Sequence, residues 1–277
     1  MKKNLVLCVV LLFFGLQPCF AQNTVKFDKD TPLKVLQTEA DKGNPDAQCW
    51  LAICYEIGLQ KDCDIDKPKS EELFSKAAKN ADEKLATVQY SKAVCYANGY
   101  GIVKTKDLEK AVEWYRKAAE QEFAPAQCSL GLCYLKGEGV SRNLDKGFQL
   151  FEKAKEQHYP LAYVYLYSCY ANGHGTEVDR DRADFYLEIA AVDCKLPEGR
   201  YALGMTYLAA QNGRASVNNF RIAAQRGHAG AQCQLGNCYY YGIGGLERDV
   251  QEAAKLWRKA AEQGHADAKK RLDQLGE

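Results

Sequence analysis

The stretch PAQCSLGLCYLKGEGV, residues 125–140, decides the fold because the chain repeats it. Close copies are DAQCWLAICYEIG at residues 46–58 and GAQCQLGNCYYYGIG at residues 230–244, and looser copies begin at Val88, Ala162 and Gly199. A motif that recurs along one chain marks a structural unit rather than a catalytic one. The sequence therefore describes architecture more fully than chemistry.

Each copy is followed by a polar turn, usually rich in glycine, and then by a second amphipathic segment. Two landmarks recur every 32 to 41 residues. One is the tyrosine that closes the first segment, at Tyr55, Tyr96, Tyr134, Tyr170, Tyr207 and Tyr239; the other is an anchor in the second segment, at Phe74, Tyr115, Phe151, Leu187, Phe220 and Trp257. Two independent landmarks with one period predict an all-α solenoid of helix-turn-helix repeats.

The same landmarks give the expected organisation of the chain. Residues 1–21 are predicted to be a signal peptide, and residues 22–277 a single solenoid. A cap helix is expected at residues 31–43, with Thr31 as its N-cap, and a charged C-terminal cap at residues 266–277. The six repeats are expected at about 44–82, 83–123, 124–159, 160–194, 195–228 and 229–265.

The N-terminal segment has the layout of an export signal. Lys2 and Lys3 precede an apolar run at residues 5–16, and Ala21 offers a small residue for cleavage. The run is short for a bilayer span, so we expect an exported protein, periplasmic or secreted, with no stable membrane span after cleavage. A retained anchor and a lipoprotein acylated at Cys19 are the alternatives.

The charge balance bears on the kind of partner. The chain has 37 Lys and Arg against 36 Asp and Glu; the signal segment contains two lysines and no acid, so the rest carries a net charge of −1. Such a chain has no long-range field to attract nucleic acid or an anionic membrane. We expect a monomer whose partner is a protein or peptide.

The repeated motif also resembles a known family. Residues 126–140 with 114–121, and residues 231–244 with 257–265, are similar to the Sel1-like repeat, and the resemblance extends over about residues 31 to 277. It implies a right-handed superhelix related to tetratricopeptide repeats, and an adaptor scaffold that binds through its concave surface. Export and abundant cysteine also resemble the cysteine-rich Sel1 proteins of Helicobacter, some of which bind or cleave penicillins. The expected function is thus a non-enzymatic scaffold; the alternative is a protein that binds β-lactams or cell-wall fragments, with weak hydrolase activity.

Ten cysteines follow the signal segment. Pairs such as Cys49 and Cys54 are five residues apart on one helix and point about 140° away from each other, so they cannot form a disulfide. We expect buried free thiols at a repeated core position, with pairing between adjacent repeats left open. Cys63 and Cys194 break the pattern, and each is a candidate reactive or bridging thiol. The repeated core thiols are Cys54, Cys95, Cys133, Cys169 and Cys238.

No pattern of residues predicts catalysis, a metal or a cofactor. The chain lacks C-x-x-C, H-E-x-x-H, S-x-x-K and the glycine-lysine signature of a phosphate-binding loop. His228 and His265 hold equivalent places in turns, which favours a structural role for both. The sequence therefore predicts no catalytic, cofactor-binding or metal-binding residue.

One stripe of the first helices varies between repeats while the core stays constant. Such a stripe is typical of a groove for a partner, and packing between repeats is the alternative interpretation. The candidate partner-binding residues on it are Trp50, Asn98, Lys136, Tyr165, Asn172, Asn237 and Tyr241.

Overall fold

The protein is a string of helix pairs. The computed structural model describes residues 27–60 and 62–276, and this part of the chain contains no strand. The N-terminal segment predicted to be a signal peptide lies outside the described residues. The helices are α1 (Leu33–Asp41), α2 (Pro45–Ile57), α3 (Lys67–Ala78), α4 (Ala86–Asn98), α5 (Leu108–Glu120), α6 (Ala124–Lys136), α7 (Leu144–Glu156), α8 (Pro160–Asn172), α9 (Arg180–Glu188), α10 (Pro197–Ala209), α11 (Gly213–Gln225), α12 (Ala229–Tyr241), α13 (Val250–Glu262) and α14 (Ala266–Leu275). A π-helical turn, Ile189–Asp193, extends α9, and a 3-10 turn, Ile243–Gly245, follows α12.

A shared set of hydrogen bonds closes each helix pair. The second helix begins at an Asp or Asn whose side chain accepts a backbone N–H of the first turn, as Asn143 does from Lys146. The backbone N–H of that same cap donates to the carbonyl of the recurring tyrosine, at 2.9 Å from Asn143 to Tyr134. The same pairing joins Asp66 to Tyr55, Asp107 to Tyr96, Asp179 to Tyr170, Asn212 to Tyr207 and Asp249 to Tyr239. The tyrosine recurs where its backbone ties one helix to the next.

The paired glycines of the regular turns have separate tasks. Gly137 ends α6 in the left-handed conformation, with φ of 76°. Gly139, with φ of 68°, lies so close to the preceding repeat that a Cβ there would clash with the carbonyl of Leu108 at the start of α5. Gly175 and Gly244 make the same approach to Leu144 and Gly213. The second glycine therefore allows one repeat to stack on the previous one.

Small residues inside the first helices admit the aromatic anchors. A Cβ on Gly131 would lie 2.7 Å from the ring of Phe151, which is fully buried on α7 of the same repeat. Gly204 meets Phe220 and Gly236 meets Trp257 in the same way. This close approach by the aromatic anchor of the neighbouring helix offsets the cost of about 1 kcal/mol that a glycine brings to a helix interior.

The first described helix begins later than the sequence predicted. Pro32, not Thr31, is the N-cap residue of α1, and it has no side-chain cap bond. The hydroxyl of Thr31 instead donates to the carboxylate of Asp28 at 3.0 Å, within a turn that precedes the helix. At the other end, α14 packs its Ala268 against the last repeat and presents a charged outer face.

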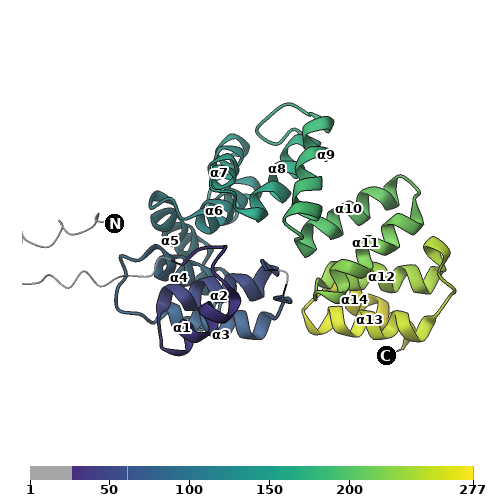
Figure 1. Cartoon of the computed structure of the whole chain (residues 1–277), viewed down its shortest axis with the longest axis horizontal. Coiled ribbons are helices and arrows are strands. Elements are labelled where there is room, and N and C mark those ends of the chain that lie inside the picture. The colour runs from purple at the N-terminus through teal and green to yellow at the C-terminus, as the bar shows by residue number, and fades with distance from the viewer. Residues whose placement is uncertain (1–26, 61, 277) are drawn as a thin grey trace, which may run out of the picture.

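The stacked pairs curve into an arch. Figure 1 shows α1 to α3 at one foot, α6 to α9 around the top, and α12 to α14 at the other foot, so that the first and last repeats face each other. The sequence between α2 and α3 reaches across this opening, because the amide of Ile65 donates to the carbonyl of Arg226 at 3.0 Å. Residues more than 160 positions apart therefore meet on the inner side of the arch.

Candidate functional site

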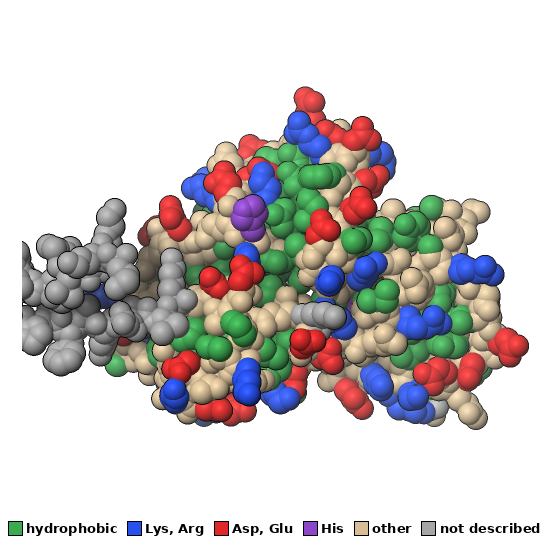
Figure 2. Space-filling model, viewed as in Figure 1, with side chains coloured by type: hydrophobic (Ala, Val, Ile, Leu, Met, Phe, Trp, Pro, Cys, Tyr) green, Lys and Arg blue, Asp and Glu red, His purple; other side chains and the backbone are tan. Residues whose placement is uncertain are grey.

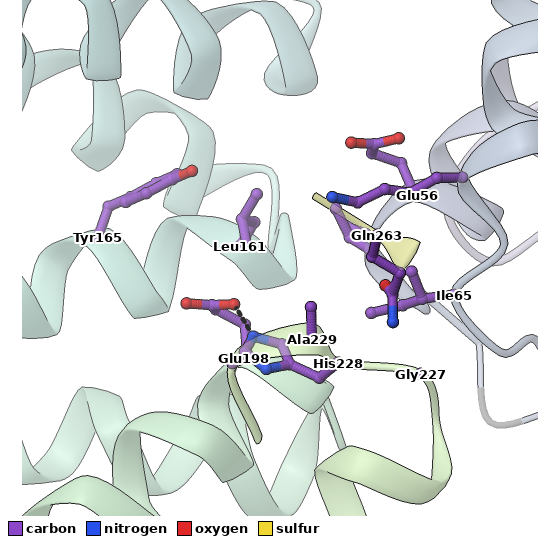
Figure 3. Close-up of a pocket in the computed structure, with 12 residues that line it drawn as sticks. Glu56, Ile65, Leu161, Tyr165, Glu198, Gly227, His228, Ala229 and Gln263 are labelled. Carbon is purple, nitrogen blue, oxygen red and sulfur yellow. Dashed lines mark hydrogen bonds and ion pairs between the residues drawn. The ribbon is translucent and has the colours of Figure 1, made fainter. Parts of the chain in front are cut away.

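A cavity of about 300 Å³ lies on the inner side of the arch. It forms where the ends of the arch converge on α8, so that four separate repeats contribute to its wall. Figure 3 shows these side chains around one space. The lining residues are Glu56, Ile57, Ile65, Lys67, Leu161, Tyr165, Glu198, Gly227, His228, Ala229, Gly230 and Gln263.

Arg226 precedes the lining residue Gly227, and its guanidinium contacts the repeat that supplies Ile65 to the cavity. Its Nη2 donates to the carbonyls of Gly58, Gln60 and Cys63 at 2.9, 2.5 and 3.0 Å, and its Nη1 donates to the carbonyl of Lys195 at 2.6 Å. We call these contacts the Arg226 clasp, and the described residues 58–60 and 62–66 the repeat-one loop. The planar fork of arginine suits several carbonyls at once. The clasp links the first repeat to the fifth.

The surroundings of the clasp explain its local sequence. Burial lowers the pKa of Arg226, although Asp64, 3.9 Å from Nε, opposes that shift. Gly227 follows with φ of 88°, and a Cβ there would lie 2.9 Å from the carbonyl of Ile65. A side chain at residue 227 would therefore push the loop away from the α11–α12 turn.

His228 and Glu198 form the polar base of the cavity. The Nδ1 of His228 accepts the N–H of Ala231 at 3.0 Å and so caps α12, which leaves Nε2 as the protonated nitrogen that donates to Glu198 at 2.5 Å. The ring also stacks on Tyr201, with centroids 4.7 Å apart. The structural role predicted for His228 in its turn is confirmed, and its contact with Glu198 adds a cavity wall. His265 caps α14 through the same atom.

Tyr165 is the aromatic wall of the cavity. Its ring stacks on Phe151 at 4.8 Å, and burial raises the pKa of its hydroxyl, which stays neutral in consequence. Figure 3 shows this hydroxyl and the carboxylates of Glu56 and Glu198 around the same space. Glu56 also accepts the hydroxyl of Ser70 at 2.8 Å. The cavity thus combines apolar walls with two acidic groups.

Of the seven predicted contact residues, Tyr165 alone lines the cavity. Trp50 was a wrong prediction: it is 7% exposed and packs edge-to-face on Phe123, so it belongs to the core. Its ring is covered by Phe123 of the second repeat, which is the packing alternative. Trp50 therefore cannot meet a partner in this arrangement.

The other predicted contact residues lie on the surface but apart from the cavity. Asn98 and Asn172 are exposed and donate back to the carbonyls of Val94 and Ser168 within their own helices. Lys136 is exposed beside Glu138, and half-buried Asn237 donates to Gln234. Tyr241 is 56% exposed and accepts a hydrogen bond from Arg271 in the C-terminal helix. The structure does not gather these residues into one site.

Sequence reasoning missed most of the cavity. Glu198 and His228 come from the repeat that departs furthest from the motif, and Ile65 from the long turn of repeat one. Those two departures were visible in the sequence, and they are the signal that could have located the site. The cavity is built where the repeat is irregular.

The ten described cysteines are free thiols, and eight of them are buried. Burial raises the pKa of Cys169 to about 12 and that of Cys238 to about 11, so these thiols behave as apolar core groups, as predicted. Cys63 differs because a hydrogen bond with Cys54, together with the nearby charge of Arg226, lowers its pKa.

The described residues contain no group of three or more His, Cys, Asp or Glu side chains that could hold a metal ion. Among the described helices, none has both the length and the apolar character needed to cross a bilayer.

Comparison with known families follows this geometry. The model of the Sel1 repeat matches residues 45–82, 85–123, 124–159, 161–191 and 229–265, which together exceed half of the chain. The chain belongs to the Sel1 repeat family. The match covers the cavity walls from α2 and α8, but not residues 192–228, which supply Arg226, Glu198 and His228.

Individual relatives extend this comparison. The chain is 41% identical over 177 residues to DAP3-binding cell death enhancer 1 of Rattus norvegicus, covering 62% of this chain and 34% of the relative. It is 32% identical over 117 residues to the ERAD-associated E3 ubiquitin-protein ligase component HRD3B of Arabidopsis thaliana, covering 42% of this chain and 17% of that one. The chain therefore spans about a third or less of these curated relatives.

Among solved structures, the chain is similar to the Sel1 repeat protein from Oxalobacter formigenes, with a TM-score of 0.53 and 32% identity. The likeness covers 87% of this chain and 69% of the other. The Sel1 repeat scaffold is thus common to proteins whose names describe binding to, or assembly with, other proteins.

Proposed function

We propose that this Sel1 repeat protein is a non-enzymatic, monomeric scaffold that binds a peptide segment of another protein along the inner side of its arch. The observation that carries the proposal is the cavity of about 300 Å³ enclosed between the first, fourth, fifth and sixth repeats. Concave, mostly apolar cavities with a few polar groups are the usual binding sites of proteins. The relatives named for DAP3 binding and for a ligase assembly support a protein as the partner.

The lining favours a basic side chain of that segment. Ile57, Ile65 and Leu161 provide an apolar passage, and Glu56 and Glu198 provide acceptors, against a single lysine at Lys67. The lining therefore contains one more Glu side chain than Lys side chains. A lysine or arginine places its stem on apolar walls and its charged head on carboxylates.

On the face that Figure 2 shows, basic residues do not form a separate patch without acidic neighbours. Figure 2 shows Lys and Arg interspersed with Asp and Glu over the visible face. The proposal therefore assigns recognition to the cavity and not to the outer surface.

Peptide selection tests this function directly. Displayed random peptides are selected on the immobilised protein, and the affinities of synthetic versions are measured by fluorescence polarisation. We expect the selected peptides to share a lysine or arginine, and Glu198→Gln to weaken binding about tenfold, because a charge-assisted hydrogen bond contributes about 1.5–3 kcal/mol. Tyr165→Phe keeps the stack on Phe151 and removes only the hydroxyl. Its loss of peptide affinity should therefore be smaller than that of Glu198→Gln.

Glu113→Gln is the matched control, since this carboxylate lies exposed on α5 away from the cavity. Circular dichroism of each variant checks that the fold is kept. Selected peptides without a basic residue, or equal affinity for the wild type and Glu198→Gln, would overturn the proposed site. Turnover of a chromogenic β-lactam by the wild type would overturn the non-enzymatic assignment.

We also propose that the protein is exported and that residues 1–21 are removed. The support is the basic start at Lys2 and Lys3, the apolar run at residues 5–16 and the small residue Ala21. The intact mass of the protein purified from its own cell should correspond to a chain that begins at Gln22. A full-length mass, or an acylated Cys19, would contradict this cleavage.

A further inference from the structure

The buried apolar core is continuous through the first four repeats and is interrupted before the fifth. One cluster of buried side chains extends from Phe27 to Ala183. The buried clusters of the fifth and sixth repeats lie beyond residue 216. Among the described residues, the buried apolar cluster between these parts consists of Val164, Ala190 and Leu196. The apolar packing that joins the two parts of the arch is therefore small.

Helix α10 explains this interruption. The first helix of a regular repeat contributes apolar side chains to the core, as α12 does with Leu235 and two cysteines. The buried residues of α10 are Pro197, Gly199 and Gly204, which have no long apolar side chain. Met205 of the same helix is 36% exposed. Helix α10 therefore passes little apolar packing from the fourth repeat to the fifth.

The turn before α10 contains an extra residue. Before α6, the amide of Phe123 donates to the carbonyl of Ala118, five positions earlier, at 3.2 Å. Before α10, the amide of Leu196 donates to the carbonyl of Ala190, six positions earlier, at 3.1 Å. The π-helical turn that extends α9 accommodates the additional residue. Such turns are frequent at functional sites. We call residues 189–197 the repeat-five joint.

The Arg226 clasp holds the two parts together across the opening of the arch. It connects the turn between α11 and α12 to three carbonyls of the repeat-one loop, and the amide of Ile65 donates back to the carbonyl of Arg226. The Nη1 of Arg226 also donates to the carbonyl of Lys195, within the repeat-five joint, at 2.6 Å. One side chain therefore contacts both the opening and the joint.

The cavity lies between the same two parts. Ile65 and Tyr165 come from the first part, and Glu198, His228 and Gln263 come from the second. Figure 3 shows both sets of side chains around one space. Binding cavities are common where two structural units meet. A movement of one part relative to the other would therefore change the width of the cavity.

We propose that the protein is a two-part clamp, in which the described residues up to 188 and those from 198 onward move as rigid units about the repeat-five joint. The Arg226 clasp is the latch that keeps the cavity closed. Hinged closure around a binding site is a common protein motion. Water can replace the guanidinium at each carbonyl, so the latch opens while the buried cores of both parts keep their packing.

This inference does not rest on the peptide-binding proposal, because it concerns the chain without a ligand. Opening separates Ile65 of the first part from Gly227 of the second, and thereby widens the cavity. The position of α10 between α9 and α11, where the arch turns toward its second foot, is visible in Figure 1.

Distances between spin labels test the clamp in the whole protein. A keto amino acid replaces two exposed residues, and nitroxides attached to it leave the cysteines unlabelled. One pair, Glu71 on α3 and Lys259 on α13, spans the opening. Two control pairs each lie within one part: Glu71 with Glu113 on α5, and Arg214 on α11 with Lys259. Pulsed electron–electron double resonance measures the three distances without a ligand.

Arg226→Ala should lengthen the spanning distance by more than about 2 Å and broaden its distribution, because the latch is lost. Both distances within one part should stay as in the wild type. Arg226→Lys, which lacks the planar fork, should shift the spanning distance less. Arg116→Ala removes an exposed arginine of α5 and should change none of the three distances.

Gly199→Ala alters the joint itself, because its Cβ would lie 2.6 Å from the backbone of Ala190. We expect it to change the spanning distance and neither of the control distances. Circular dichroism checks that each variant is folded, and where Gly199→Ala does not fold, the Arg226 variants decide.

Two results would overturn the clamp. An unchanged spanning distance in both Arg226 variants would show that this side chain is not the latch. Equal broadening of all three distances would show that the arch loosens evenly along its repeats and has no joint before α10.

Discussion

The turn of repeat one and the turn of repeat three perform the same joining task in different ways. In both, the backbone N–H of the residue that caps the second helix donates to the backbone carbonyl of the recurring tyrosine at 2.9 Å. The pairs are Asp66 with Tyr55 and Asn143 with Tyr134. The repeat-three turn then packs its Gly139 on the previous repeat. The repeat-one loop lacks that second glycine and extends to Arg226 instead. The shared bonds build the solenoid, and the differing residues build the cavity.

Gly139→Ala should disturb this comparison most. The added Cβ clashes with the backbone of Leu108 and also places alanine at φ of 68°, so we expect a loss of about 4 kcal/mol in the free energy of unfolding. Urea unfolding followed by far-ultraviolet circular dichroism measures it. Gly245→Ala is the matched control, because Gly245 has φ of 84° with open space around it, and it should cost only about 1 kcal/mol.

Equal losses for Gly139→Ala and Gly245→Ala would mean that the turn tolerates a side chain and that stacking does not depend on the close approach. The recurring contact at Gly175 and Gly244 would then need another explanation.

Arg226→Ala should have the second largest effect, concentrated in the repeat-one loop. The loss of the clasp leaves the carbonyls of Gly58, Gln60 and Cys63 without this donor, and we expect about 2 kcal/mol of local stability to be lost. Hydrogen exchange at the amide of Ile65, which donates to residue 226, should become about thirtyfold faster. X-ray scattering should show a wider arch.

Arg214→Ala serves as the control, because this arginine is exposed on α11. Arg226→Lys sharpens the result: it keeps the charge but not the planar fork, so it should recover only part of the protection at Ile65. Unchanged exchange in Arg226→Ala would show that the loop is held by its own packing.

The two turns also show how far the sequence could predict this molecule. The period of the tyrosines and aromatic anchors predicted the helical solenoid, because each repeat obeys local rules of capping and packing. Trp50 was misplaced because a stripe on one helix does not reveal which neighbour covers it. The clasp was beyond prediction, since the distance between Arg226 and Cys63 depends on the curvature accumulated over the intervening repeats. The irregular segments were visible as departures from the motif, but their meeting point was not.

The smallest expected effect concerns what the two turns share. Asp66 and Asn143 each accept the N–H three residues later in the chain, so Asp66→Ala and Asn143→Ala should each cost about 1 kcal/mol at pH 7.

The two caps differ in their pH dependence. Burial raises the pKa of Asp66, but hydrogen bonds from Lys69 outweigh burial and lower it. A carboxylate whose pKa is lower in the folded state contributes stability above its unfolded pKa of about 3.9, and this contribution is lost as the pH falls through the folded value. The cost of Asp66→Ala should therefore shrink in acid, whereas that of Asn143→Ala should not, because an amide does not titrate. Parallel urea titrations at pH 7 and pH 3 measure both costs, and a cost of Asp66→Ala that stays constant would show that its charge contributes nothing beyond the hydrogen bond it accepts.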